Sequence, residues 1–393
     1  MKDVLYLAWR YLAYHRVKTA ILIASIALIV YLPVGLNVLV SQSAAELTAR
    51  AESTPLLLGA KGSPLELVLN SLYFESEAPD TTTYEQAERI AASGLAEAVP
   101  LYIRFRSRER PIVGTSLEYF AVRSLRLAAG RPMALLGECV LGAEAARALE
   151  VGPGDSVVSS PESVFDLAGV YPLRMRVVGV LERAHTPDDR AIFVDVKTAW
   201  IIEGLGHGHQ DLAAPQAASA VLSRTDDRIT ANASIIQYNE ITADNIDSFH
   251  FHGELSGYPL TAVIAVPESE RSGVILLGRY EGADQIAQIL RPVQVMGELL
   301  ETILTIQSYV LAAVAVLAVA TLATAALVFW LGVRLRRREL ETLWKIGGSR
   351  SAVAGVLVSE VVVVLVLAAA TAAGLTALTS RFGSAAIRMF LLS

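Results

Sequence analysis

The histidines are the residues of this chain whose type and spacing most directly indicate chemistry. Four of the six form two His-x-His pairs, His207 with His209 and His250 with His252. Side chains two positions apart on a strand share a face, so each pair offers two imidazole ligands to one ion, with zinc as the expected metal. The alternative is that all four are surface residues of a Gly-rich loop and an aromatic-flanked strand. Neither paired cysteines nor a His-Glu-x-x-His helix accompanies them.

Other patterns that carry catalysis are missing from the sequence. The segment from Gly59 to Ser63, Gly-Ala-Lys-Gly-Ser, lacks the wider glycine spacing and the Gly-Lys-Ser/Thr ending of a phosphate-binding loop. No Ser-His-Asp spacing or zinc-protease helix is found. Cys139 is the single cysteine, which excludes an internal disulfide. The chain is therefore not expected to be an enzyme.

Three apolar runs explain why 53% of the residues are hydrophobic and only 18% charged. They cover residues 19–40, 304–333 and 352–379. Each is long enough for a membrane-spanning helix, since about 20 helical residues cross a hydrocarbon core of roughly 30 Å. A cleaved signal peptide is the alternative for the first run, but no small-x-small cleavage site follows it closely. We expect a membrane protein with a bundle of three transmembrane helices.

Glu360 is the one charged residue of the third run. An ionisable side chain at that depth usually faces the interior of a helix bundle or a partner. The alternative is that Glu360 lies near the cytoplasmic boundary and reaches the arginines of the preceding loop.

That loop, residues 334–351, separates the second and third runs and is basic. Its six Lys and Arg against two Glu place it in the cytoplasm, because basic residues in short loops resist translocation. Leu340, Leu343 and Trp344 follow the i, i+3, i+4 spacing of an apolar helical stripe. The pattern predicts a short surface helix that a cytoplasmic partner can bind; a plain stop-transfer loop is the alternative.

The region between the first and second runs, residues 41–303, has the composition of a water-soluble domain. It holds 21 Lys and Arg against 35 Asp and Glu, which argues against nucleic-acid binding. The segments Pro100–Arg106, Leu173–Leu181 and Asp188–Ala199 are interpreted as strands, and Ala143–Leu149 as a helix. We expect an α+β domain.

The two ends of the chain complete the expected organisation. Residues 1–18 alternate apolar and basic positions as in an amphipathic helix that lies along the membrane surface. The tail after the third run, residues 380–393, is too short to cross a membrane and is placed outside. The predicted order is amphipathic helix 1–18, transmembrane helix 1 19–40, extracytoplasmic domain 41–303, transmembrane helix 2 304–333, cytoplasmic loop 334–351, transmembrane helix 3 352–379 and extracytoplasmic tail 380–393.

The loop sequence Arg336-Arg-Arg-Glu-Leu-Glu-Thr-Leu-Trp-Lys-Ile-Gly-Gly-Ser-Arg350 resembles the signature loop of the FtsX-like permease domain. That domain occurs in the MacB/LolC/FtsX superfamily of type VII ATP-binding-cassette membrane subunits. Residues 1–18 resemble the family's elbow helix, and residues 151–199 resemble its MacB-type periplasmic core domain. One departure is that family members usually carry four spans, whereas three are found here.

The resemblance implies a permease subunit that works by mechanotransmission: ATP hydrolysis in a separate cytoplasmic ATPase drives movement of the periplasmic domain. It implies no cofactor here, ATP and Mg being bound by the ATPase. The implied partners are that ATPase, a second copy or a homologous permease, a periplasmic adaptor or substrate-binding protein, and membrane lipid. The implied location is the bacterial inner membrane, with the N-terminus cytoplasmic and the large domain periplasmic. The residues implied to couple to the ATPase are Arg338, Glu339, Leu340, Leu343, Trp344, Ile346 and Gly347.

Two further points stay open. A membrane-anchored metal-binding or sensing module that uses the His-x-His pairs, an FtsX-like activator of a periplasmic enzyme and a scaffold protein are the alternative functions. Small residues in 318–326 and 368–374 are expected to face a second subunit, because they let helix backbones approach closely.

Overall fold

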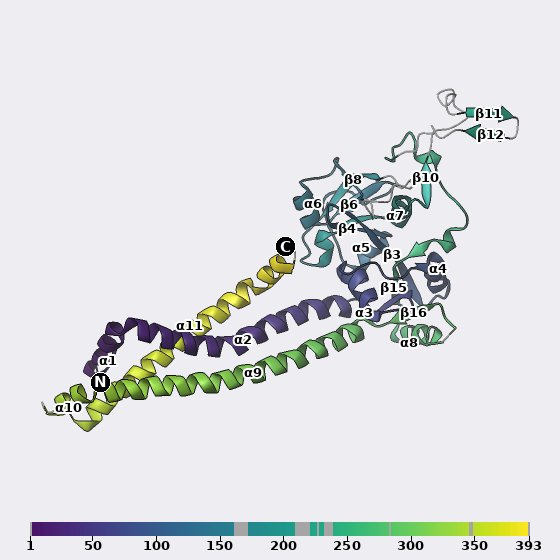
Figure 1. Ribbon diagram of the computed structural model, residues 1–393. Helices are drawn as coiled ribbons and strands as arrows, with labels where there is room; N and C mark the ends of the chain where they lie inside the picture. The colour runs from purple at the N-terminus through teal and green to yellow at the C-terminus, as the bar shows by residue number, and fades with distance from the viewer. Residues whose placement is uncertain are drawn as a thin grey trace. The chain divides into compact units, whose positions relative to one another are not determined.

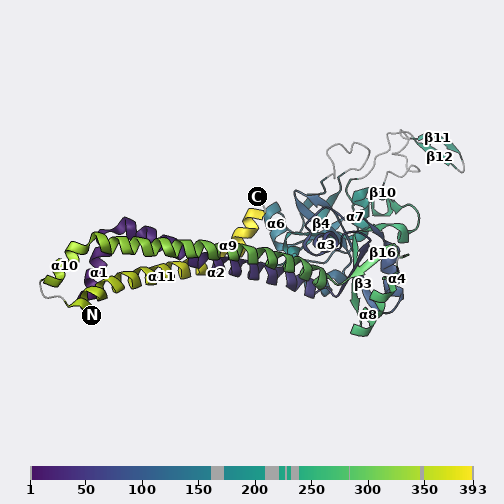
Figure 2. The ribbon, with the colours of Figure 1, turned by 60° about the horizontal axis from the view of Figure 1, so that its bottom comes forward.

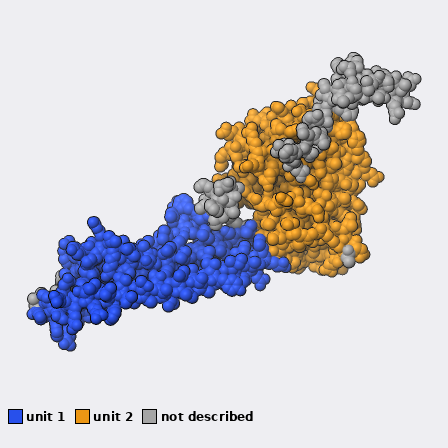
Figure 3. All heavy atoms as spheres, in the orientation of Figure 1, with its two compact units in different colours: residues 1–48, 297–393 blue, residues 49–296 orange. Residues whose placement is uncertain are grey.

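The computed structural model describes residues 2–160, 172–208, 221–225, 228–231, 239–282, 284–345 and 349–391. They form two compact units, coloured separately in Figure 3. Unit 1 comprises Met1–Thr48 and Gly297–Ser393, and unit 2 comprises Ala49–Met296.

Unit 1 is helical. Its helices are α1 (Lys2–Tyr14), α2 (Arg16–Glu52), α9 (Pro292–Leu335), α10 (Arg337–Lys345) and α11 (Arg350–Leu391). The helices α2, α9 and α11 share one buried core, and α11 crosses α2 (Figures 1 and 2). In the described part of the chain, these three are the helices long and apolar enough to cross a membrane.

The long helices extend beyond the predicted apolar runs. The helix predicted for 19–40 begins at Arg16 and continues to Glu52, and the helix predicted for 304–333 begins at Pro292. The third long helix, α11, stays helical to Leu391 through most of the predicted tail 380–393, and the extracytoplasmic position of that tail stays a prediction. This stretch contains no proline, and Gly383 lies inside the helix without ending it.

The core of unit 1 brings α1, α2, α9 and α11 together. The buried residues of this core are Leu12, Leu22, Ile26, Ala27, Ala325, Val364, Ala368 and Ala372. Ala368 and Ala372 of α11 therefore pack inside the chain, whereas the other residues of segment 368–374 are exposed, so contact of this segment with a second subunit stays a prediction. Small side chains let α11 approach its own neighbours closely, which is the same packing rule applied within one chain.

Unit 2 is built on a mixed sheet. Among the described residues the sheet has ten strands in the order β16-β1-β15-β3-β4-β9-β6-β8-β5, with β7 paired to β8. The strands are β1 (Leu56–Ala60), β3 (Ala96–Ser107), β4 (Arg110–Thr115), β5 (Leu127–Gly130), β6 (Glu138–Leu141), β7 (Ser156–Val158), β8 (Arg174–Leu181), β9 (Ile192–Asp195), β15 (Ala262–Pro267) and β16 (Ala287–Leu290). The β4/β9 and β6/β8 pairs are parallel, and the other pairs of this sheet are antiparallel.

Helices and short strand pairs surround this sheet. The helices are α3 (Pro64–Val68), α4 (Tyr84–Ala92), α5 (Glu118–Val122), α6 (Ala143–Leu149), α7 (Val196–Glu203) and α8 (Glu270–Arg279). The short helical turns are η1 (Leu69–Tyr73), η2 (Pro187–Arg190), η4 (Ile246–Ser248) and η5 (Leu255–Gly257). The antiparallel pairs are β2 (Thr82–Thr83) with β14 (Pro259–Leu260), β10 (Gly206–Gly208) with β13 (Phe249–Phe251), and β11 (Val221–Thr225) with β12 (Arg228–Ala231).

The core of unit 2 lies between the sheet and its helices. Trp200 of α7 and Tyr102 of β3 are among its largest fully buried side chains. The Trp200 indole donates from Nε1 to the carbonyl of Pro259 at 2.8 Å, so its polar atom is satisfied in the core. Burial of these rings fixes α7 against the sheet, which positions β10 immediately after it.

The strand predictions for unit 2 are confirmed at β3 and β8, and the helix prediction 143–149 is confirmed by α6. The prediction of one strand over Asp188–Ala199 is wrong in its outer parts. Only Ile192–Asp195 is a strand, preceded by η2 and followed by α7. The physical reason is that Asp195 accepts a hydrogen bond from the Lys197 backbone N–H at 2.9 Å. This N-cap starts a helix despite the strand preference of Val196 and Thr198.

Candidate functional site

The predicted surface helix of the loop is present as α10. Its charged face carries an exposed ion pair between Arg337 and Glu341 at 3.1 Å, one helical turn apart. Trp344 is 51% exposed, and the Arg350 guanidinium lies 4.8 Å from its ring centroid. This cation–π contact holds the indole at the surface, where an apolar anchor is accessible to a partner.

The other predicted coupling residues are placed as follows. Arg338 and Glu339 are exposed on α10, and Leu340 is partly buried. Leu343 belongs to the helix, and its side chain is outside the described part of the structure, as are Ile346 and Gly347 entirely.

Arg336 is the single residue between α9 and α10, and it is where α10 is fixed to the bundle. Its Nη1 donates to both carboxylate oxygens of Glu360 on α11, at 2.8 and 3.0 Å. Its guanidinium lies 3.5 Å from the ring centroid of Tyr11 on α1. Glu360 is only 4% exposed. The sequence left two alternatives for Glu360, and both hold in part. Its side chain faces the interior of the bundle and also pairs with an arginine of the loop.

A second arginine, Arg50 in the last turn of α2, is buried in unit 2. It donates from Nη2 to Asp188 Oδ1 at 2.9 Å and forms a second hydrogen bond from Nη1 to Asp188 Oδ2. It also donates to the Tyr119 hydroxyl at 3.0 Å and to the Leu72 carbonyl at 3.0 Å. The Tyr119 hydroxyl and the Thr186 hydroxyl donate to the same carboxylate, at 2.7 and 2.9 Å.

The charges of this cluster are held away from water. Arg50 is 7% and Asp188 1% exposed, and Tyr119 is fully buried. Burial by itself would raise the pKa of Asp188, but the adjacent Arg50 guanidinium outweighs it and the pKa lies below its usual range. Burial, followed by the Asp188 charge, raises the pKa of Tyr119 to about 12. The carboxylate therefore stays ionised and the phenol stays a donor, so the cluster is an internal clamp and not an acid–base site.

Three of the four predicted metal-ligand histidines come together. The antiparallel β10/β13 pair sets His207 directly opposite His250, and His252 follows two positions later on the same face. The ring centroids are 4.8 Å (His207 to His250), 5.0 Å (His207 to His252) and 4.9 Å (His250 to His252) apart. One potential ligand atom from each ring lies within 4.8 Å of the others. His209 lies outside the described residues.

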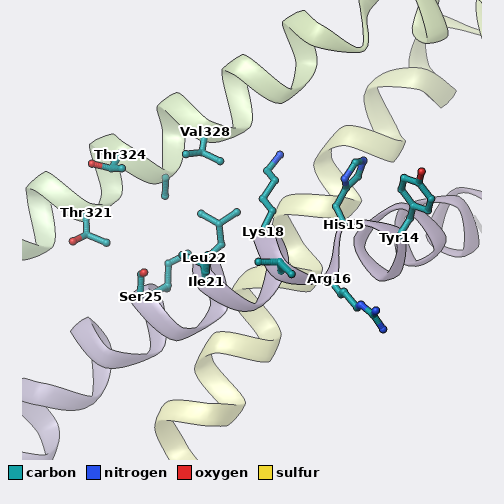
Figure 4. Close-up of a pocket in the computed structure, with 13 residues that line it drawn as sticks. Tyr14, His15, Arg16, Lys18, Ile21, Leu22, Ser25, Thr321, Thr324 and Val328 are labelled. Carbon is teal, nitrogen blue, oxygen red and sulfur yellow. The ribbon is translucent and has the colours of Figure 1, made fainter.

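Unit 1 also contains a cavity of about 700 Å³ between α2 and α9 (Figure 4). Figure 4 shows His15, Arg16 and Lys18 at one end and the hydroxyls of Ser25 and Thr321 toward the other. Apolar side chains complete the wall: Val17, Ile21, Leu22, Ile26, Ala325 and Val328. Cationic groups beside methyl groups match the chemistry of a membrane interface, where headgroup phosphates meet acyl chains.

Sequence reasoning missed two of the residues that organise these sites. The sequence offered one indication for Arg50, which is a lone arginine shortly after the first apolar run. For Asp188 it offered only the residue type. Arg336 was assigned only a role in topology, because its partner Glu360 is 24 positions away in the sequence.

Comparison with known proteins identifies one family. Residues 19–240, more than half of the chain, match the family model described as MacB-like periplasmic core domain. No curated protein matches the chain.

Two solved structures are similar in part. One is the extracellular domain of the noncanonic ABC-type transporter YknZ from Gram-positive bacteria, with 14% identity and a TM-score of 0.32, covering 60% of this chain and 98% of that one. The other is the periplasmic region of MacB from Actinobacillus actinomycetemcomitans, with 11% identity and a TM-score of 0.34, covering 63% of this chain and 94% of that one.

The Arg50 clamp generates the first prediction. Arg50→Met leaves Asp188 buried without its counter-charge, and breaking a buried pair in this way costs about 3–5 kcal/mol. We expect a clearly lowered unfolding midpoint for the full chain in detergent, followed by tryptophan fluorescence. Arg174→Met is the matched control, since the Arg174–Glu240 pair is at the surface with a 3.8 Å separation and contributes about 1 kcal/mol or less. Equal midpoints for the two variants would refute the structural importance of the clamp.

Proposed function

The chain belongs to the family with a MacB-like periplasmic core domain, the permeases of MacB/FtsX-type ATP-binding-cassette transporters. From this premise we propose that it works by mechanotransmission. ATP hydrolysis by a separate cytoplasmic subunit moves α10, and the long helices pass this movement to unit 2. A substrate is then handled at the outer face of the membrane, without passing between the helices.

The observation that carries the proposal is the attachment of α10. An exposed aromatic anchor on a short helix between two candidate spans is a surface that a partner's groove can hold. Arg336 connects the start of that helix to Glu360 and Tyr11, so a force on α10 acts on α11 and α1 as well as on α9. A single nitrogen, Nη1, donates to both oxygens of Glu360, and the planar guanidinium also lies over the Tyr11 ring, a stacking that the compact ammonium of a lysine does not reproduce.

The continuity of α2 supports the outward half of the mechanism. Its 37 residues are helical from Arg16 to Glu52, with Pro33 inside the helix. Its last turn carries Arg50, which is locked into unit 2 by Asp188 and Tyr119. A helix clamped in this way acts as a lever, since its end cannot rotate without breaking a buried ion pair.

The remaining parts of the proposal concern assembly and location. We expect a bacterial inner-membrane protein with the N-terminus and α10 in the cytoplasm and unit 2 outside, since the α10 loop is basic and unit 2 is acidic. A second copy or a homologous permease would pack along residues 318–326 of α9, which are mostly exposed. Small side chains there allow close helix contact.

Trp344→Ala tests docking on α10. If Trp344 is an anchor, its removal should weaken association with the co-purifying ATPase by about 2 kcal/mol, or roughly 30-fold in Kd. The measurement is binding of the ATPase to the detergent-solubilised chain. Trp330→Ala is the matched control, because Trp330 is also exposed and also has an arginine, Arg334, over its ring, but lies on α9. Docking through α10 is wrong if both variants bind the ATPase as tightly as the unaltered chain.

Glu360→Ala tests transmission separately from docking. The ATPase should still bind, because α10 keeps its exposed face, but permease-dependent ATP hydrolysis in liposomes should fall about tenfold or more, which corresponds to about 1.4 kcal/mol of lost coupling. Glu341→Ala is the control, since its pair with Arg337 is exposed. If Glu360→Ala hydrolyses ATP as fast as the unaltered chain, the Arg336–Glu360 pair does not take part in coupling.

Reporter fusions test the orientation. A reporter inserted at residues 346–348 should behave as cytoplasmic, and one fused after Ser393 as extracytoplasmic, because three spans separate the N-terminus from the end of this sequence. The measurement is the activity of paired reporters that work on opposite sides of the membrane. A cytoplasmic signal after Ser393 would contradict the three-span arrangement.

A further inference from the structure

The three-histidine cluster on β10 and β13 rests on an alternation of side chains. Along β13 and the next residue the order is Phe249, His250, Phe251, His252, so the phenylalanines take one face and the histidines the other. Phe251 packs on Trp200 and Tyr258, with ring centroids 6.3 and 5.8 Å apart. Burial of the aromatic face therefore forces the two histidines onto the same side.

The partner strand is adapted to this arrangement. His207 is flanked by Gly206 and Gly208, and a Cβ on these glycines would lie 2.6 Å from the Phe251 ring and 2.5 Å from the Phe249 ring. Only glycine lets the phenylalanine rings pack across β10, while His207 projects to the opposite face beside His250. The glycines and phenylalanines together hold three imidazoles on one surface.

Two hydrogen bonds fix the positions of these histidines. The Nδ1–H of His250 donates to the Ser248 carbonyl at 3.0 Å, which selects the tautomer whose lone pair is on Nε2. A bond of this kind from the second ring nitrogen to a carbonyl is usual for metal-binding histidines, because it orients the ring and increases its basicity. The Tyr258 hydroxyl donates to the His252 carbonyl at 2.9 Å, which fixes the backbone there.

The distances between the histidine nitrogens suit a metal ion after a small movement of the rings toward one another. With Zn–N bonds of about 2.0–2.1 Å in tetrahedral geometry, ligand nitrogens lie about 3.3 Å apart. The potential ligand atoms here lie within 4.8 Å of one another, a difference that rotation of the imidazoles about their side-chain bonds can remove.

We propose that His207, His250 and His252 bind one divalent transition-metal ion, zinc first of all, through three imidazole nitrogens. Imidazole favours zinc, copper and nickel over calcium or magnesium. Three protein ligands leave the fourth position to water or an incoming group, which is the pattern of an accessible site and not of a closed structural one. His207 and His250 are half-buried and His252 is exposed, so the ion can exchange with solvent.

This site goes beyond the proposed transport function and does not depend on it. The ion would join β10 to β13, two segments some forty residues apart in the sequence, and thereby stabilise the strand pair beside α7 (Figure 1). A metal that binds only the folded chain raises its stability by mass action.

The experiment uses the full chain in detergent, purified without a polyhistidine tag and stripped with a chelator. Titration with zinc chloride alone, followed by calorimetry and by metal analysis after desalting, should give about one ion per chain. The double variant His250→Ala/His252→Ala should lose this binding, with affinity at least about tenfold lower. His185→Asn is the control: it replaces a histidine of the same unit outside the cluster, and asparagine tolerates the positive φ of 58° at this position.

A second measurement needs no variant. Diethyl pyrocarbonate modifies histidines, and zinc should protect His207, His250 and His252 of the unaltered chain but leave His185 and His15 reactive, as read by peptide mass spectrometry. Zinc binding that survives in the double variant, no binding near one ion per chain, or equal modification of all histidines with and without zinc would each overturn the proposal. None of these outcomes bears on ATPase docking by α10, so the two proposals fail independently.

Discussion

The buried ion pair between Arg50 and Asp188 is the constraint on which unit 2 depends. A guanidinium and a carboxylate removed from water are tolerated only when their hydrogen-bonding groups are satisfied, and here Tyr119, Thr186 and the Leu72 carbonyl complete the set. The turn η2 that carries Asp188 is itself held tightly, since a Cβ on Gly142, just before α6, would lie 2.1 Å from the Asp188 carbonyl oxygen. The end of α2 is thus fixed to η2, and η2 to α6 and β9. Each of these elements contributes to the central sheet or packs against it.

Unit 1 contains a pairing of the same chemistry between Arg336 and Glu360. Arg336 pairs with a buried carboxylate and stacks on a tyrosine, as Arg50 pairs with Asp188 and meets Tyr119. Both arginines lie at or next to a helix end, and each makes two hydrogen bonds to one carboxylate. A bundle held mainly by small and aliphatic side chains resists sliding weakly, because its contacts carry little directionality.

Sequence patterns predicted what depends on local periodicity, and they failed where the structure depends on distant partners. The apolar runs predicted the three long helices, and the spacing of Leu340 and Trp344 predicted α10. The His-x-His spacing predicted that His250 and His252 share a face, because the alternation of side chains along a strand depends only on neighbouring residues. The pairing of β10 with β13, which adds His207, was not predictable, since its register is set by rings packing on Trp200. Asp188 reaches Arg50 across 138 positions, and no local signal marks it. Asp195 did carry a local signal, a helix cap, which the strand preference of its neighbours obscured.

The arginine clamps and the histidine cluster differ in how their polar groups are satisfied. Arg50 donates to acceptors supplied by its own chain from all sides, and its carboxylate partner accepts from three different side chains. Opposite charges meet there, and the Arg123 guanidinium lies beside them, 5.7 Å from the centroid of the Tyr119 ring. The histidines instead bring three like groups together on one face of the strand pair, with ring centroids 4.8 to 5.0 Å apart. Phenylalanine packing, two close-approach glycines and the Ser248 hydrogen bond all work to hold this arrangement. Three imidazoles held on one face in this way are the geometry from which the metal site is proposed.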